Sequence, residues 1–551
     1  MSKNEVNPLI YYLCLMLWIG GTMVGFSQQS TVEGMVTDEN GLPLPGATVV
    51  EQGTNNGTTT DFEGKFLILA GVESSLEISF VGYETLVVSI NNQSRMNIVL
   101  SPDSSLDEVI VIGYGTTTKE SFVGTATKID GENMESKNTT NISQALAGEV
   151  AGVTVINSSG QPGSNSTIRI RGFGSIIGNR NPLYVVDGVP FNGDINSINK
   201  ADIESYTILK DASATAIYGS RGANGVVLIN TKKGKAGKSQ IEVNINMGTN
   251  RRALPEYETI TNQEQYVELG WESLKNFAIT KKIDDPNAYA SNNLFSERGI
   301  SSHYNMWDKP GNELIDPATG KFKSGINRKY TPENWNDYLF RNGERLEASL
   351  RLSGGVEKTT YATSFAALDE KGFLINSEYQ RYNTRVNVGH EVKKWLKGSF
   401  NLGYTYSESF QTGQESNATS AFWFANNIPT IYPVFLRDED GKYVKDEIFG
   451  GNQYDFGNNE RGFGLGSNPV ATTIYDIDQN QNHQLDGNTE LEASFLKHFK
   501  VMLRYGIQYQ NVSRDNRGSP LYGFSAANGG DIYKVKNSLL VNTFLQSISY
   551  K

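Results

Sequence analysis

Cysteine and histidine are scarce in this sequence of 551 residues. The one cysteine is Cys14, and the four histidines, which lack any spacing typical of a metal site, are His303, His390, His483 and His498. Because Cys14 lies inside an N-terminal apolar run, we expect a mature chain without disulfide or thiol chemistry. There is no serine nucleophile elbow either, so the sequence supports no enzyme, no metal site and no cofactor.

Charged residues are also few, at 20% of the chain, and they leave a net charge of −11. An acidic balance argues against nucleic-acid binding, which needs a basic face. The basic stretch KKGKAGK at 232–238 leads into a Gly-Lys-Ser triplet, but Lys232 stands where a P-loop requires glycine, and a strand pattern follows. We therefore expect neither nucleic acid nor nucleotide as a partner.

Long apolar runs are limited to the N-terminus, where LIYYLCLMLWIGGTMVGF follows Lys3. Gly25 and Ser27 supply the small residues that a signal peptidase reads, so residues 1–27 are predicted to be a signal peptide cut after Ser27. A membrane anchor is the alternative, which Gly20 and Gly21 disfavour. The sequence therefore predicts export.

Glycine (56 residues) and tyrosine (27 residues) are abundant, which favours β structure with many turns in two or more domains. Residues 30–101 contain about seven short strand-like runs separated by turn signals, as in a β-sandwich. The stretch GMVTDENGLPLPGATVVEQGTNNGTTTDFEGKFLI resembles the carboxypeptidase regulatory-like domain. It has no HxxE zinc pair, so we interpret it as a spacer or docking module.

Two further regions follow. Residues 119–236 combine a helical patch with several strands and are predicted to form a compact α/β unit. From 237 to 551 the apolar period becomes two, as in Ile241, Val243 and Ile245. We expect eight strands of about ten residues, enough to cross a bilayer when tilted, at 241–247, 345–353, 359–368, 379–389, 395–407, 483–495, 499–510 and 539–550.

The connections between these strands alternate in length. Short turns lie at 354–358, 390–394 and 496–498, whereas the intervening connections include two very long ones at 248–344 and 408–482. Short turns on one rim and long loops on the other are typical of outer-membrane barrels. A soluble sandwich could share the alternation but not this asymmetry, so we predict a transmembrane β-barrel.

The stretches SQALAGEVAGVTVINSSGQPGSNSTIRIRGFGSI at 143–176 and NPLYVVDGVPFNGDINSINKADIESYTILKDASATAIYGSRGANGVVLINTKKGK at 181–235 resemble the plug of SusC/RagA-type TonB-dependent outer-membrane transporters. The resemblance implies a mainly β fold with a sandwich, an α/β plug and the first eight or so strands of a large barrel. Since eight strands cannot enclose a plug, we expect the chain to be an N-terminal portion of a longer barrel.

Residues 102–118 form a linker that contains DEVIVIGYG, similar to the family's TonB box. The resemblance assigns partner binding to Asp107, Glu108, Val109, Ile110, Val111 and Ile112. An extended segment with unpaired backbone groups suits strand addition to TonB. The alternative is a last strand of the sandwich.

The plug signature comprises Arg169, Arg171, Gly172, Asp187, Gly188, Lys210, Asp211, Tyr218, Gly219, Arg221, Gly222 and Gly225. We interpret these residues as structural, with Asp187-Gly188 as a tight turn. Arg169 and Arg171 are expected to meet lumen carboxylates such as Glu490 and Glu492, or else to be ordinary solvated charges. Residues 476–487 have the alternating oxygens of a calcium loop but lack its glycine and glutamate.

The long loops are predicted to bind substrate through exposed aromatic residues, namely Trp271, Trp307, Trp335 and Trp423, unless these merely pack the loops. The resemblance implies import of oligosaccharides or oligopeptides across the outer membrane. The implied partners are TonB with ExbB and ExbD, a SusD-like lipoprotein lid and outer-membrane lipid. A surface receptor or adhesin, or a signal transducer, is the alternative function.

Overall fold

The computed structural model describes residues 29–550 apart from 40, 55, 81–82, 102–108, 113–114, 119–125, 136, 138, 140, 158, 173, 175–177, 179, 254–257, 412–419 and 497. The predicted signal peptide lies outside these residues. The chain divides into two compact units, Met1–Val123 and Gly124–Lys551, which are described separately. No helix within the described ranges is both long and apolar enough to cross a membrane.

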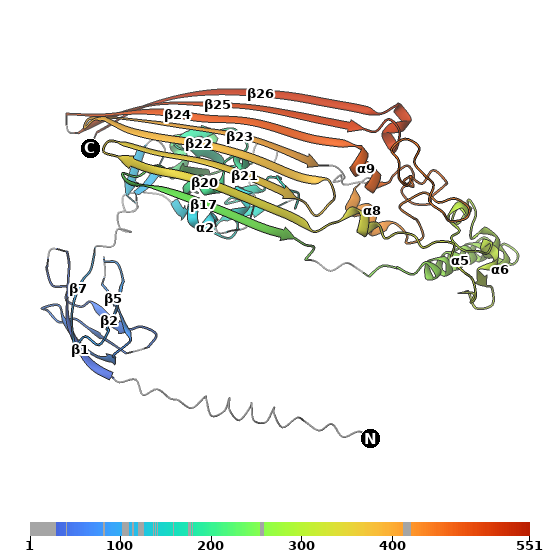
Figure 1. Cartoon of the computed structure of the whole chain (residues 1–551), viewed down its shortest axis with the longest axis horizontal. Coiled ribbons are helices and arrows are strands. Elements are labelled where there is room, and N and C mark those ends of the chain that lie inside the picture. The colour runs from blue at the N-terminus through green and yellow to red at the C-terminus, as the bar shows by residue number, and fades with distance from the viewer. Residues whose placement is uncertain are drawn as a thin grey trace, which may run out of the picture. The chain divides into compact units, whose positions relative to one another are not determined.

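The first unit is a two-sheet β-sandwich, as its alternating strands predict (Figure 1). One sheet has the order β4-β1-β7 and the other the order β3-β2-β5-β6. Val32, Leu76, Ile78 and other fully buried residues fill the space between the sheets. The strands are β1 (Gln29–Thr37), β2 (Thr48–Glu51), β3 (Gly57–Thr59), β4 (Lys65–Gly71), β5 (Ser75–Ser79), β6 (Leu86–Ser89) and β7 (Arg95–Val99).

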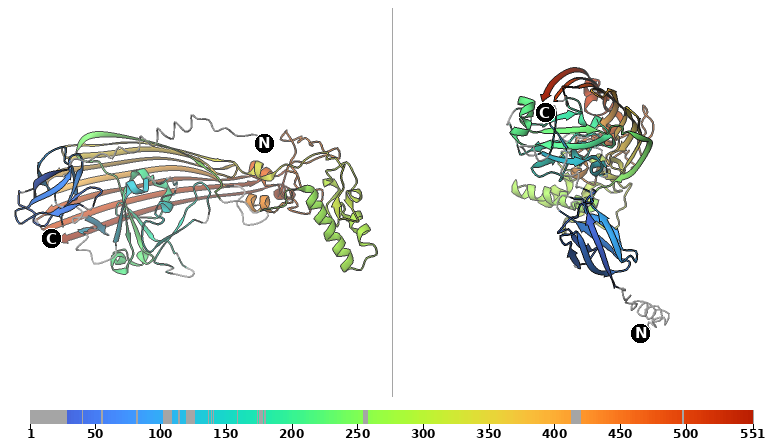
Figure 2. Two further views of the ribbon diagram at one scale, coloured as in Figure 1. Left: turned by 90° about the horizontal axis from the view of Figure 1, so that it is seen from below. Right: turned by 90° about the vertical axis from the view of Figure 1, so that its left-hand side faces the viewer.

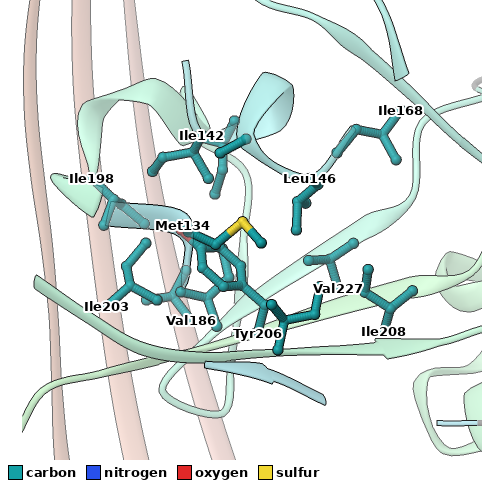
Figure 3. Packing of buried hydrophobic residues seen from close by; sticks show 14 of the residues in the cluster. Met134, Ile142, Leu146, Ile168, Val186, Ile198, Ile203, Tyr206, Ile208 and Val227 are labelled. Atoms are coloured by element: carbon teal, nitrogen blue, oxygen red, sulfur yellow. The ribbon is translucent and has the colours of Figure 1, made fainter. Parts of the chain in front are cut away.

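The predicted α/β unit is a five-stranded sheet with the order β10-β15-β16-β13-β14, together with the hairpin of β11 and β12. Its strands are β10 (Ala126–Asp130), β11 (Val153–Ile156), β12 (Thr167–Ile170), β13 (Leu183–Val186), β14 (Val189–Phe191), β15 (Ile203–Leu209) and β16 (Val226–Thr231). Short helices pack on it: α2 (Gly131–Glu135), α3 (Ile142–Ala145), α4 (Ala212–Thr215), η3 (Ile195–Ser197), η4 (Lys200–Asp202) and η5 (Ala216–Gly222). Met134, Leu146 and Tyr206 meet in its apolar core (Figure 3).

All eight predicted long strands are present, and they form one antiparallel sheet in sequence order (Figures 1 and 2). They are β17 (Gly237–Asn250), β20 (Gly343–Val356), β21 (Thr359–Lys371), β22 (Ser377–Lys393), β23 (Leu396–Gln411), β24 (Ile477–Phe495), β25 (Phe499–Gly518) and β26 (Asp531–Tyr550). β17 and β26 do not pair, so this sheet is not closed. One face exposes apolar side chains such as Ile241 and Met247, whereas the other buries polar ones such as Arg385 and Asn401.

The strands are 13 to 20 residues long, which exceeds the ten or so expected. Most of the additional residues lie at the strand ends that lead into the long loops. There the alternation of apolar residues fades, so sequence periodicity does not predict the strand. One extension takes in the incomplete calcium-loop pattern, since residues 477–487 belong to β24. There Asp478 pairs with Arg514 and Asp486 with Arg385, each at 2.8 Å.

The two longest connections fold together around aromatic cores. The first, between β17 and β20, carries α5 (Gln263–Thr280), α6 (Pro286–Asn293), η6 (Ser302–Tyr304), η7 (Gly311–Glu313), β18 (Ile315–Asp316), β19 (Lys321–Phe322) and α7 (Trp335–Leu339). The second, between β23 and β24, carries α8 (Ala421–Asn427) and α9 (Pro469–Tyr475), and the loop before β26 carries η8 (Phe524–Asn528). Ile431 and Tyr432 of the second connection lie in the core of the first.

Candidate functional site

The α/β unit lies against the polar face of the long sheet, and residues 190–200 are its docking segment. Barrel side chains bind the main chain of this segment. Arg381 donates to the Asn196 oxygen at 2.7 Å, Thr405 to the Ser197 oxygen at 2.8 Å, and Gln508 to the Pro190 oxygen at 2.7 Å. Hydrogen bonds from polar side chains of the barrel therefore hold this segment of the plug.

The predicted tight turn at Asp187-Gly188 joins β13 to β14, and both residues have positive φ angles. The Asp187 carboxylate accepts hydrogen bonds from the Thr231 main-chain N–H at 2.9 Å and from the Thr231 hydroxyl at 2.8 Å. It also accepts one from Asn401 of β23. The turn therefore links two plug strands to the barrel wall.

The other signature residues hold the plug together internally. Asp211 caps α4 by accepting from the Ala214 N–H at 2.9 Å, and Lys210 donates to the Ala151 oxygen at 3.2 Å. Tyr218 is buried, while Arg221 is exposed. The glycines lie at close contacts and bends of the chain: Gly172 after β12, Gly219 within η5, Gly222 against Thr215 and Gly225 against Ile170.

Arg169 and Arg171 do not meet the expected lumen carboxylates. Arg169 donates instead to the Asn181 side chain at 2.9 Å within the plug. Glu490 pairs with Arg504 and Glu492 with Lys500, in both cases on the adjacent strand β25. Cross-strand neighbours of opposite charge had already satisfied these carboxylates, which a one-dimensional pattern does not reveal.

A buried charge cluster joins plug and barrel around Glu347 of β20. Its carboxylate lies 2.6 Å from Arg345, 3.7 Å from Arg381 and 3.8 Å from Lys200 of the plug. Burial lowers the pKa of Lys200, which the charge of Glu347 opposes. Lys200 also donates to the Lys137 oxygen at 2.7 Å, so it is held in place from the plug side.

Above the plug, at the long-loop rim of the sheet, lies a cavity of about 750 Å³. Residues 157–166 of the plug form one wall, and the ends of β17, β20, β21 and β22 form the other. Its lining is about half polar and half apolar, and the polar half includes Asn141, Asn157, Gln161, Asn250 and Arg345. Sequence reasoning missed this site because its residues come from six separate segments; the many amides of 157–166 were the available signal.

The predicted loop tryptophans are mostly buried. Trp271, Trp307 and Trp335 are 2%, 1% and 4% exposed, so the expected exposure is wrong for these three. Trp271 donates to Ser291 and Trp335 to the Tyr432 oxygen, both at 2.9 Å, which anchors the loop cores. Only Trp423 of the four is exposed, at 42%, and its ring stacks on Phe463.

Two members of the predicted TonB box, Asp107 and Glu108, lie outside the described residues. The other four form β8 (Val109–Ile112), which pairs with β9 (Gly115–Thr118) as a separate two-stranded sheet. The segment is therefore no strand of the sandwich. The segment was expected to have unpaired backbone groups on both edges. This expectation is wrong for one edge, which pairs with β9.

Comparisons with known proteins agree with this architecture. Residues 32–111 match the CarboxypepD_reg-like domain, and residues 118–226 match the TonB-dependent receptor plug domain. TonB-dependent receptor P26 of Formosa agariphila is 31% identical over 88% of this chain, and TonB-dependent receptor SusC of Bacteroides thetaiotaomicron is 30% identical over 97%. The matches cover 43% and 50% of those relatives, so the chain spans about half their length.

Among solved structures, the RagAB peptide importer in its open-open state is similar, with a TM-score of 0.58 and 25% identity. The alignment covers 80% of this chain and 47% of that one. The sandwich, plug and antiparallel barrel strands thus recur together in proteins of one kind.

Proposed function

Because this chain belongs to the SusC/RagA-type family of TonB-dependent transporters, we propose that it takes part in energised import of oligosaccharides or oligopeptides across the outer membrane. The observation that carries the proposal is the plug's attachment. A domain held to the barrel by hydrogen bonds and by one charge cluster can be moved, because water can replace each of those bonds.

The proposed energy input is TonB, acting with ExbB and ExbD on residues 107–112. β8 has β9 on one edge, and no other strand of the described chain pairs with it. An exposed strand edge is a template for strand addition from a partner. This assignment supposes that the linker and sandwich lie in the periplasm.

The proposed substrate site is the cavity above the plug. It lies at the rim that bears the long loops, which in outer-membrane barrels is the extracellular one. Its amide-rich floor is the plug itself, so a bound substrate would touch both plug and barrel. Movement of the plug would then release the substrate inward.

The proposed lid is a SusD-like lipoprotein seated on the long loops. This proposal follows the similarity of the chain to SusC and to the RagAB peptide importer. Within the described loops, Trp423, Ile448, Phe449 and Leu465 are between 42% and 60% exposed and offer apolar surface to such a lid.

Deletion of residues 107–112 tests the import function. We expect uptake of the cargo to be lost while binding of the cargo at the cell surface persists, because binding needs only the cavity and its lid. Cargo and lid would first be identified by mass spectrometry of the native transporter extracted in mild detergent. Unchanged uptake by the deletion strain would refute the importer and favour a receptor or adhesin.

A further inference from the structure

The cavity above the plug carries an excess of positive charge. Arg251, Arg252 and Arg345 line it, and Glu370 is the one acidic residue in the lining within the described chain. The charge cluster directly behind Arg345 adds no further excess, since Glu135 and Asp194 act on Lys200 and Arg381 beside the shared Glu347. A ligand that enters the cavity therefore meets a positive potential, and an anionic group would be favoured there.

Two arginines of the cavity lining, Arg345 and Arg251, differ in how firmly they are held. Arg345 lies on β20, is 6% exposed, and donates to the Thr139 oxygen of the plug at 3.4 Å as well as to Glu347. Arg251 follows the end of β17 and is exposed. A fixed guanidinium at the wall and an adjustable one at the mouth suit recognition of a carboxylate or sulfate group.

The rest of the lining suits a chain rich in hydroxyl groups. Gln144, Asn157, Gln161 and Asn250 present side-chain amides, which both donate and accept hydrogen bonds, whereas the Asn141 amide is buried and bonded within the plug. The apolar part of the lining includes Phe373 and Phe422, against which the carbon faces of sugar rings can pack. Sugar hydroxyls would find many hydrogen-bond partners in the polar part.

We propose that the substrate is an acidic oligosaccharide whose carboxylate or sulfate group binds between Arg251 and Arg345. The hydroxyl groups of the same ligand bind the amides of the plug wall, and a cavity of about 750 Å³ has room for several sugar rings. This inference rests on the proposed import function and names the substrate class of that same cavity.

Titration calorimetry on the native transporter, extracted in mild detergent with its partner chains, tests the inference. The probes are tetragalacturonate, a sulfated carrageenan tetrasaccharide, the neutral β-1,4-galactotetraose and tetraglutamate. We expect at least one acidic sugar to bind about tenfold or more tightly than the neutral one. Arg251→Gln should weaken that binding by about five- to tenfold, Arg251→Lys should retain most of it, and added salt should weaken it.

Arg298→Gln is the matched control, because Arg298 is an exposed loop arginine that donates to the Tyr289 hydroxyl, away from the cavity lining. Its affinity for the acidic sugar should equal that of the parent. Each of three results would overturn the substrate class. The neutral sugar could bind as tightly as both acidic ones, tetraglutamate could bind more tightly than the sugars, or neither acidic sugar could bind. None of these results touches the import function, which stands or falls with the 107–112 deletion.

Discussion

Single side chains of the barrel wall recognise the plug mainly through its backbone. Arg381, Asn383 and Thr405 all donate to main-chain oxygens of the docking segment. Because a main-chain oxygen does not depend on residue identity, the docking segment tolerates substitution as long as its path is kept. Some plug side chains are bound directly: the Asp187 carboxylate accepts from the barrel's Asn401, and Lys200 within the docking segment lies 3.8 Å from Glu347.

Gly163 offers a test of how closely the cavity wall packs. It has a φ of +75°, and a Cβ there would lie 2.4 Å from the buried ring of Tyr379. Gly148 has nearly the same φ, +79°, with nothing within 4 Å of its Cβ position. We expect Gly148→Ala to cost only backbone strain, about 1 kcal/mol, and to leave cargo affinity unchanged.

Gly163→Ala should cost the same strain and also displace residues 157–166 into the cavity. Affinity for the cargo should therefore fall by about tenfold or more in calorimetry, with a lower melting temperature. Equal cargo affinities of the two alanine variants would contradict this expectation, because they would show that the plug wall accommodates the added methyl group without disturbing the cavity.

The loop tryptophans show what residue type alone leaves undecided. Aromatic residues beside amides fit both a sugar-binding surface and a loop core. Trp271, Trp307 and Trp335 are buried because the two long connections pack against each other, and these two segments are far apart in the sequence. The Asp187-Gly188 turn, by contrast, is a local signal and was predicted correctly.

At the scale of elements, helix α5 is tied to the loop around β19 by two carboxylates. Glu264 accepts from Arg328 at 2.8 Å, and Glu268 accepts from the Phe322 N–H at 2.9 Å. Burial disfavours ionisation of both, but these hydrogen bonds outweigh it and hold each pKa below its usual range. The stabilisation is therefore present above about pH 4.3, the usual glutamate value, and is lost as the pH falls through the lowered pKa values.

We expect the segment 318–330 to exchange its amide hydrogens faster at pH 3 than at pH 6, after correction for the intrinsic pH dependence of exchange. The double variant Glu264→Gln/Glu268→Gln should already exchange faster at pH 6 and respond less to acid. Glu272→Gln, an exposed position on the same helix, is the control. The same acid response in parent and double variant would contradict this role.

The strands themselves follow from sequence, whereas their ends do not. Alternation over Ile241, Val243 and Ile245 specifies both a strand and which face meets lipid. The polar extension of β24 through residues 477–482 has no such alternation, and its side chains suggested only an incomplete calcium loop. Backbone pairing with β23 and β25 holds this stretch as a strand, although its side chains do not predict one.

At the scale of the whole molecule, the proposed import requires the plug to move away from the wall. Val189 and Gly506 face each other across that boundary, and a Cβ at Gly506 would lie 3.4 Å from the Cβ of Val189. This is close to the separation that a disulfide needs. The predicted absence of cysteine from the mature chain makes the pair the only thiols in such a variant.

We expect the Val189→Cys/Gly506→Cys variant to lose uptake when oxidised and to regain it with a reducing agent. Surface binding of cargo should continue in both states. Each single cysteine variant should import at parent rates regardless of redox state. Full uptake by a quantitatively crosslinked protein would mean that cargo passes while β14 stays on the wall.

Because β10 is an edge strand of the plug sheet, its position determines which contacts of the plug a pulling force would break first. The chain enters the second unit just before β10, which is an edge strand paired with β15 from Ala126 and Leu209 to Asp130 and Ser205. A pull from the N-terminal side would peel this strand pair by pair and then draw out Met134 from the core. β13 and β14, which carry wall contacts, lie at the opposite edge, but α2 directly after β10 is also attached to the wall, since Asn244 of β17 donates to Glu135 at 3.1 Å. The load would therefore reach the Glu135 contact before the contacts of β14.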